Sequence, residues 1–364
     1  MLDNYKILNA EEINTPALAI YPSLVVENIK LALNIAGKSI LRPHIKTCKT
    51  PEVIQLMLAN GITHYKCATL AEAELLGIQK VKDVLLAYQP VCTAILRLKN
   101  IIQVYPNTIF SCLIDNSQSL KEIAEAFENK TINVFIDVNV GMNRTGVSLQ
   151  KVTELLASFS DYPNVLLQGL HAYDGHINDV SLIVRAENAN QAYHKALQIK
   201  LMAETKLNKT LSLVIGGTPT FAIHAQQPNV QCSPGTFILG DKGYSVFTDL
   251  QFTVAAIVLT RVISIIDKNL LCVDVGHKAV ASENPLHQRL YILGINNVEL
   301  ISHSEEHLVV KVADTSKHHI GDMWYAVPYH ICPTVALHHQ LEVIENCYRT
   351  QQWTVTARNR KINY

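Results

Sequence analysis

The sequence lacks the features that mark nucleic-acid-binding, membrane-bound and secreted proteins. Lysine plus arginine equals aspartate plus glutamate at 31 each, so no charge excess points to a nucleic acid or a membrane surface as the main partner. No apolar run approaches the roughly 18–20 residues of a membrane helix, and the first residues lack the apolar segment of a signal peptide. We therefore expect a cytoplasmic protein that binds neither nucleic acid nor membrane.

Paired cysteines are also missing. The eight cysteines are scattered along the chain, and none forms a C-x-x-C pair. The chain has 364 residues, of which 48% are hydrophobic and 17% are charged, and this is enough for two well-packed domains. Without a secretion signal, we expect the thiols to be reduced.

Short β-type runs alternate with helical segments over the first two thirds of the chain. Strands that alternate with helices predict a parallel sheet, and eight such units predict a closed (β/α)8 barrel of the TIM type. The eight predicted strands are residues 17–21, 40–46, 64–69, 84–89, 109–115, 132–139, 166–173 and 211–216.

The pattern changes after about residue 240, where short β-type runs follow one another without amphipathic helices between them. Such a series predicts a mostly antiparallel β domain. We therefore divide the chain into a segment 1–16 that packs with the β domain, a barrel over 17–240 and a C-terminal β domain over 241–364.

Polar residues gather at the predicted C-terminal ends of the barrel strands, where barrels of this type place their functional sites. The second strand ends at Lys46, and the sixth leads to Arg144. The seventh offers His171, Tyr173 and His176. Lysine is among the residues least often buried. Lys46 is therefore either a solvated lysine at a frayed strand end or a reactive amine.

Two glycine-threonine turns are candidates for binding a phosphate. Gly216, Gly217 and Thr218 follow the eighth predicted strand, and a second turn contains Thr236. Glycine lets backbone N–H groups approach an anion, and the start of a helix favours negative charge, although a tight turn has the same sequence. A lysine opposite a phosphate site favours pyridoxal phosphate held as a Schiff base on Lys46.

Seven motifs, in order along nearly the whole chain, resemble the family of D-threonine aldolase and D-serine dehydratase. They are "RPHIKT", "GMNRTG", "GLHAYDGH", "IGGTPT", "SPGTF", "SEEH" and "HICPTV". The resemblance implies a pyridoxal-phosphate enzyme that has a barrel of the alanine racemase type and an added β domain. It also implies a homodimer and a D-amino acid substrate.

The resemblance implies roles for the matching residues. Lys46 would carry the cofactor, Arg144 would contact its ring near the phenolic oxygen, and Tyr173 would line it. His176 would lie beside the substrate hydroxyl as a candidate base. The cofactor phosphate would be held by Gly216, Gly217, Thr218 and Thr236.

The resemblance further implies that His330 and Cys332 bind a divalent metal. On a strand, an H-x-C pair points both side chains to one face, although the bare motif also occurs by accident. Imidazole and thiolate suit Zn²⁺, whereas Mn²⁺ prefers more oxygen ligands. Relatives commonly have a histidine two residues beyond the lysine, where this chain has Cys48, so no role in the metal or substrate shell is assigned at that position.

The implied chemistry has two main outcomes for a D-3-hydroxy amino acid. Removal of the hydroxyl proton leads to cleavage into glycine and an aldehyde, while removal of the Cα proton and loss of the hydroxyl lead to a 2-oxo acid. His176 favours cleavage, so D-threonine aldolase activity is the leading hypothesis and a dehydratase is the alternative. An amino-acid racemase and a non-catalytic pyridoxal-phosphate carrier are further alternatives.

Overall fold

The computed structural model describes residues 2–364, and the chain divides into two compact units. The barrel unit consists of Lys30–Lys46, Met57–Gly235 and Asn359–Tyr364. The sheet unit consists of residues 2–29, Thr47–Leu56 and Thr236–Arg358. Within residues 2–364, no helix is both long and apolar enough to cross a membrane.

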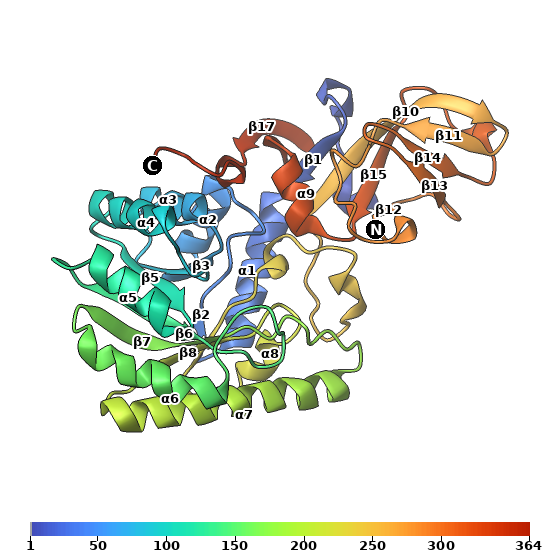
Figure 1. The fold of residues 1–364 in the computed structure, drawn as a ribbon. Helices are drawn as coiled ribbons and strands as arrows, with labels where there is room; N and C mark the ends of the chain where they lie inside the picture. Colours follow the sequence, from blue (N-terminus) through green and yellow to red (C-terminus); the bar gives the residue numbers. More distant parts are fainter. Residues whose placement is uncertain (1) are drawn as a thin grey trace. The chain divides into compact units, whose positions relative to one another are not determined.

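The barrel unit is built on an eight-stranded parallel sheet whose neighbours run in the order β2-β9-β8-β7-β6-β5-β4-β3 (Figure 1). The bridge between His44 and Lys66 joins β3 back to the chain that follows β2, so the sheet curls into a nearly closed barrel. The strands are β2 (Ile40–Leu41), β3 (His64–Cys67), β4 (Asp83–Leu86), β5 (Ile109–Ile114), β6 (Ile132–Asp137), β7 (Val165–Ala172), β8 (Ser212–Ile215) and β9 (Val230–Cys232).

The predicted fold class is confirmed, but one of the eight predicted barrel strands is wrong. Residues 17–21 contain β1 (Ala17–Ile20), which pairs with β10 and β16 of the other sheet. The eighth barrel strand is β9, which pairs with β2 and β8. With only three residues, "VQC" carries too little periodicity to stand out in the sequence.

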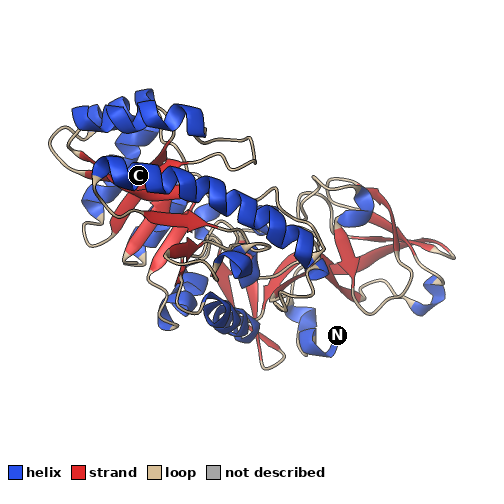
Figure 2. Cartoon of the chain, turned by 90° about the horizontal axis from the view of Figure 1, so that it is seen from below, coloured by secondary structure: helices blue, strands red, loops and turns tan. Residues whose placement is uncertain are grey.

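Helices follow the barrel strands, and their ends carry sequence signals. Thr69 accepts a hydrogen bond from the Glu72 amide at the start of α3, and Asn116 accepts one from the Ser119 amide at the start of α5. Figure 2 shows α7 as the longest helix, lying along the strands. Six helices lie within the barrel unit: α3 (Leu70–Ile78), α4 (Thr93–Val104), α5 (Ser117–Ala126), α6 (Leu149–Ser158), α7 (Leu182–Leu207) and α8 (Phe221–His224). Two further helices, α1 (Pro22–Ala36) and α2 (Pro51–Ala59), contain residues of both units.

Apolar side chains from alternate positions fill part of the barrel interior. Leu85, Leu113, Phe135 and Val214 form one buried cluster, with one residue each from β4, β5, β6 and β8. This layer is the packed core expected of a barrel, and it leaves polar groups to the strand ends.

The sheet unit contains a nine-stranded, mostly antiparallel sheet, as predicted for the C-terminal residues. Its main path runs β13-β14-β11-β10-β1-β16-β17, and β15 pairs with β10 and β12. Its elements after β1 are β10 (Ala256–Asp267), β11 (Leu270–Val273), β12 (Leu290–Ile292), β13 (Glu299–His303), β14 (Leu308–Lys311), β15 (Met323–Pro328), α9 (Ile331–Leu337), β16 (Gln340–Glu345) and β17 (Tyr348–Thr354).

Candidate active site

A cavity of about 440 Å³ opens in the barrel unit and is lined by residues that follow the strand ends. Its volume lies in the range of sites that bind small molecules, roughly 300–1,000 Å³. The lining residues used below are Lys46, Lys66, Gln89, Arg144, His171 and Tyr173. Lys46 lies in the turn after β2, not on the strand itself, because β2 ends at Leu41.

Three cationic side chains surround the ring of Tyr173, which directly follows β7. The ring centroid lies 5.8 Å from Lys46 Nζ, 5.3 Å from Lys66 Nζ and 5.1 Å from Arg144 Cζ. Like charges so close together repel one another unless an anion is present. The cavity therefore suits a ligand that carries negative charge, and pyridoxal phosphate fits this requirement.

A buried hydrogen bond to a carboxylate fixes His171 at the wall of the cavity. Its Nδ1 lies 2.8 Å from Asp137 Oδ1, and Asp137 Oδ2 accepts hydrogen bonds from Thr145 and Gln89. Burial favours the neutral acid, but the bonds with His171 and the two other donors outweigh it and hold the pKa of Asp137 below its usual value. The ionised carboxylate therefore accepts a hydrogen bond from Nδ1–H, and the Nε2 atom of His171 carries the free lone pair.

The Nε2 atom of His171 is buried and has no hydrogen-bond partner among residues 2–364. Buried polar atoms without a partner are rare, and one at the wall of a cavity offers an acceptor for a bound water or ligand. Burial lowers the pKa of His171, so the ring is neutral and presents an acceptor to the cavity. This orphaned atom is the second feature that fits a bound cofactor.

The predicted phosphate cradle forms a tight turn after β8. Gly216 has φ +89°, which a residue with a side chain rarely adopts, and a Cβ there would lie 3.1 Å from the Cα of Phe221. The Gly217 amide donates to Asp174 Oδ1, and the Gly235 amide donates to Thr218 Oγ1. Asp174 thus holds the Gly217 amide inside the protein, so a phosphate here requires other donors of the turn.

Asp174 and His224 form a fully buried pair that supports this turn, with His224 Nε2 lying 2.7 Å from Asp174 Oδ2. We expect Asp174→Ala to lower the free energy of unfolding by about 3–5 kcal/mol, because it leaves buried donors without their carboxylate. Urea unfolding followed by circular dichroism measures the loss. The exposed Asp161→Ala is the control and should change the free energy by less than about 0.5 kcal/mol.

The pH dependence of stability tests the same pair. Burial raises the pKa of Asp174, but the hydrogen bonds from His224, Thr220 and the Gly217 amide lower it by more. The net shift of the pKa is therefore downward. A folded pKa below the unfolded one means that the stabilisation is present above about pH 4 and is lost as the pH falls through the folded pKa. A variant that unfolds like the wild type at pH 7 contradicts this role of Asp174.

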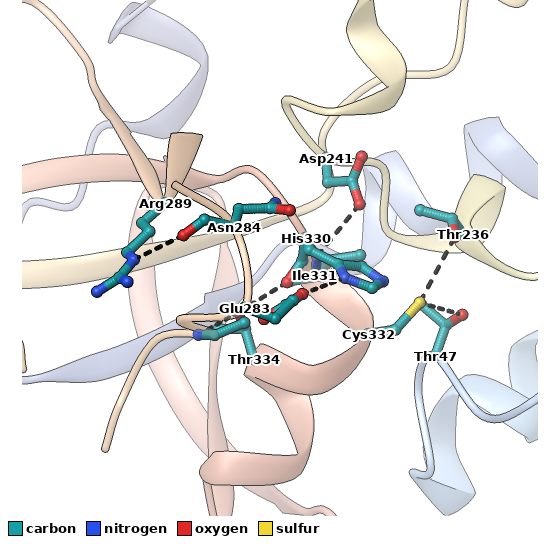
Figure 3. Close-up of polar contacts among 11 residues, drawn as sticks. Thr47, Thr236, Asp241, Glu283, Asn284, Arg289, His330, Ile331, Cys332 and Thr334 are labelled. Atoms are coloured by element: carbon teal, nitrogen blue, oxygen red, sulfur yellow. Dashed lines mark hydrogen bonds and ion pairs between the residues drawn. The ribbon is translucent and has the colours of Figure 1, made fainter. Parts of the chain in front are cut away.

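The H-x-C pair lies in the sheet unit at the start of α9 (Figure 3). His330 is the residue before the helix and Cys332 lies in its first turn, so the prediction that this segment is a strand is wrong. Asp241 Oδ2 accepts a hydrogen bond from the Ile331 amide, which fixes the helix start. Burial raises the pKa of Asp241 to about 6.

The two side chains of the pair nevertheless meet. A hydrogen bond with Cys332 raises the pKa of His330 to about 9, and Glu283 adds to this effect against the opposing effect of burial. Glu283 Oε1 lies 2.5 Å from His330 Nδ1, so the carboxylate orients the imidazole as it does for many metal-binding histidines. The Sγ of Cys332 lies 3.1 Å from Thr47 Oγ1 and 3.5 Å from Thr236 Oγ1.

The pair supplies one nitrogen and one sulfur ligand, a donor set that suits Zn²⁺. Across the described residues 2–364, no three histidine, cysteine, aspartate or glutamate side chains are grouped so as to hold a metal ion. The protein's own contribution to a metal shell is therefore two ligands, and water or substrate atoms must complete it.

The remaining predicted residues are placed as follows. Tyr173 and Arg144 lie together at the cavity with Lys46. His176 is exposed and packs beside Gly141, where a Cβ would lie 2.7 Å from its Nε2. Thr236 lies beside Cys332 in the sheet unit.

Sequence reasoning missed two residues of these sites, Lys66 and Glu283, and it placed His171 at the end of the seventh predicted strand without assigning it a role. Lys66 occupies an inward position of β3 between the buried Tyr65 and Cys67, so strand alternation was the available signal. Glu283 carried no such signal, because its partner His330 lies far away in the sequence, and the same distance hid the pairing of His171 with Asp137.

The barrel with a cavity at its strand ends is the fold of many enzyme classes, and the comparison with protein families assigns the chain to one of them. The chain belongs to the family with an alanine racemase N-terminal domain, whose model matches residues 22–242. A putative serine dehydratase domain matches residues 255–344. Enzymes of this family depend on pyridoxal phosphate.

Individual relatives are lyases that act on D-amino acids. A D-threonine aldolase of Arthrobacter sp. is 27% identical over 356 residues, covering 93% of this chain and 92% of the relative. A D-serine dehydratase of Dictyostelium discoideum is 25% identical over 387 residues, covering 92% of this chain and 94% of the relative.

Solved structures share the fold over nearly the full chain. The D-threonine aldolase of Filomicrobium marinum superimposes with a TM-score of 0.86 at 24% identity, covering 97% of this chain and 98% of that one. The D-threo-3-hydroxyaspartate dehydratase of Delftia sp. HT23 superimposes with a TM-score of 0.79 at 21% identity, covering 94% of this chain and 97% of that one. Its solved variants include a cysteine-to-alanine change in the metal-free form and a histidine-to-alanine change two positions earlier.

Proposed function

We propose that the protein is a lyase that acts on D-3-hydroxy amino acids with pyridoxal phosphate and a divalent metal, and that it cleaves D-threonine to glycine and acetaldehyde. The observation that carries the proposal is the cluster of Lys46, Lys66 and Arg144 around Tyr173, beside the orphaned Nε2 of His171. This wall combines an amine for covalent attachment with positive charge for an anionic cofactor.

The residues of the barrel unit would bind and orient the cofactor. Pyridoxal phosphate, when bound, supplies an electron sink that lets a bond at the substrate Cα break. Lys46 provides the amine that attaches it, and Arg144 provides a guanidinium for an anionic oxygen. Asp137 keeps the proton on Nδ1 of His171 and thereby presents its Nε2 as an acceptor.

His330 and Cys332 would hold the divalent metal, with Glu283 fixing the imidazole. A bound divalent ion supplies Lewis-acid chemistry at a hydroxyl oxygen of the substrate. Zn²⁺ is the first candidate because of the nitrogen and sulfur donors, and Mn²⁺ is the second. His176 remains the proposed base at the substrate hydroxyl.

Elimination of water is the second candidate reaction, and one observation favours it. Two solved variants of D-threo-3-hydroxyaspartate dehydratase carry one replacement each, of a histidine and of a cysteine two positions apart, and His330 and Cys332 have the same spacing. Cleavage ranks first because the aldolase of Arthrobacter sp. shows the higher identity of the two curated relatives and His176 offers a base.

A product assay separates the candidate functions. The protein is incubated with pyridoxal phosphate, Zn²⁺ or Mn²⁺, and either D-threonine or D-serine. We expect glycine and acetaldehyde from D-threonine in equal amounts. Pyruvate and ammonia from D-serine without any glycine from D-threonine move the assignment to the dehydratase. Appearance of the L-isomer alone indicates a racemase, and no turnover with a cofactor-loaded protein indicates a carrier.

A further inference from the structure

Lys66 is a second lysine in the cofactor cavity, and the proposed function counts its charge but assigns it no contact of its own. Its side chain is only 1% exposed, less than that of any other lysine among the described residues. Its Nζ donates a hydrogen bond to Ser233 Oγ and lies 5.3 Å from the centroid of the Tyr173 ring.

The surroundings of Lys66 do not compensate for a buried positive charge. Within residues 2–364, no carboxylate lies within ion-pair distance of its Nζ, and one hydroxyl is its hydrogen-bond partner. Burial, together with the charges of Lys46 and Arg42, lowers the pKa of Lys66 to about 7 against the opposing effects of Asp174 and Asp137. A buried amine with a single neutral partner retains unused donor capacity, because an ammonium has three donors.

The position of Lys66 also connects it to the predicted phosphate turn. Ser233 Oγ donates to the carbonyl of Gly216, at the end of β8. Lys66 is thus joined through one hydroxyl to the turn that follows this strand. Its own strand lies next to the segment that carries Lys46, since the Ile45 amide donates to the Lys66 carbonyl. The amine of Lys66 is therefore linked to the turn through Ser233, and its backbone neighbours the segment that carries Lys46.

We infer that Lys66 is a second cofactor contact, whose amine donates a hydrogen bond to an acceptor atom of bound pyridoxal phosphate while Lys46 carries the covalent bond. The acceptor is either a phosphate oxygen or the ring nitrogen. The inference rests on the proposed use of pyridoxal phosphate. An anionic cofactor supplies the negative charge that Lys66, Lys46 and Arg144 lack around Tyr173.

Equilibrium binding of pyridoxal phosphate and of pyridoxal, which has no phosphate, tests the inference in Lys66→Met. A charge-assisted hydrogen bond is lost, so we expect roughly 10- to 100-fold weaker binding. Weakening for pyridoxal phosphate alone assigns the phosphate oxygen. Equal weakening for both compounds, with a shifted visible absorbance band, assigns the ring nitrogen. The matched control is Lys200→Met, which removes a buried lysine that pairs with Glu204 on α7.

Circular dichroism and the melting temperature establish that the variants are folded, and Lys66→Gln replaces Lys66→Met if the latter is not. Wild-type affinity for both compounds, together with a wild-type spectrum, in the folded variant overturns the inference and leaves the proposed function intact. A wild-type protein that binds no pyridoxal phosphate overturns both.

Discussion

Lys46→Ala is expected to lose the visible absorbance band of covalently attached pyridoxal phosphate and to lose activity by about 10³-fold or more. The reason is that the substitution removes the amine to which the cofactor would be attached. The three cations around Tyr173 are reduced to two, so non-covalent affinity for the cofactor should fall as well. Absorbance spectra of the purified variant, with and without added cofactor, measure the effect.

The exposed Lys151→Ala serves as the control and should keep both the band and the activity. A Lys46→Ala protein that retains the band without added amine contradicts the assignment. Lys66 would then be the attachment point, since its Nζ lines the same cavity and its lowered pKa leaves a larger fraction of the amine unprotonated.

Cys332→Ala is expected to lose its bound divalent metal and at least about 10²-fold in activity. The protein supplies only two ligands, so the substitution leaves His330 as the single one. Even the loss of a residue that only orients a metal ligand lowers metal affinity or activity by about 10- to 100-fold. Metal content by plasma mass spectrometry and activity on D-threonine are the two measurements. The exposed Cys347→Ala should match the wild type in both.

Chelation provides the complementary test of the same residues. Treatment of the wild type with a chelator should remove the activity, and added Zn²⁺ or Mn²⁺ should restore it, whereas neither ion should rescue Cys332→Ala. Activity that survives complete removal of metal shows that His330 and Cys332 have no role in the reaction.

Much of the barrel was predictable, because parallel strands and amphipathic helices carry strong periodic signals. Seven of the eight strands follow from this pattern, and the count of eight was right. Residues 17–21 were wrongly assigned to the barrel because β1 is buried along its whole length, as a barrel strand is. Its partners β10 and β16 are far away in the sequence. Sheet membership depends on such distant pairing and not on local pattern.

The site was predictable where a residue type is unusual at its position, as for Lys46 at the end of an apolar run. The H-x-C segment was read as a strand because β15 precedes it, whereas α9 begins at Ile331, where Asp241 binds the helix start. The pairing of Asp137 with His171 depends on the register between β6 and β7, which the sequence does not show. The homodimer, the cytoplasmic location, the absence of nucleic-acid and membrane partners and the domain boundaries stay predictions.

Covalent attachment of pyridoxal phosphate to Lys46 is the central claim, and borohydride reduction followed by peptide mass spectrometry tests it most directly. Reduction of the cofactor-loaded wild type should fix the phosphopyridoxyl mass on the peptide that contains Lys46 and on no other. The same mass on a peptide that contains Lys66 but not Lys46, or on no peptide at all, would contradict it.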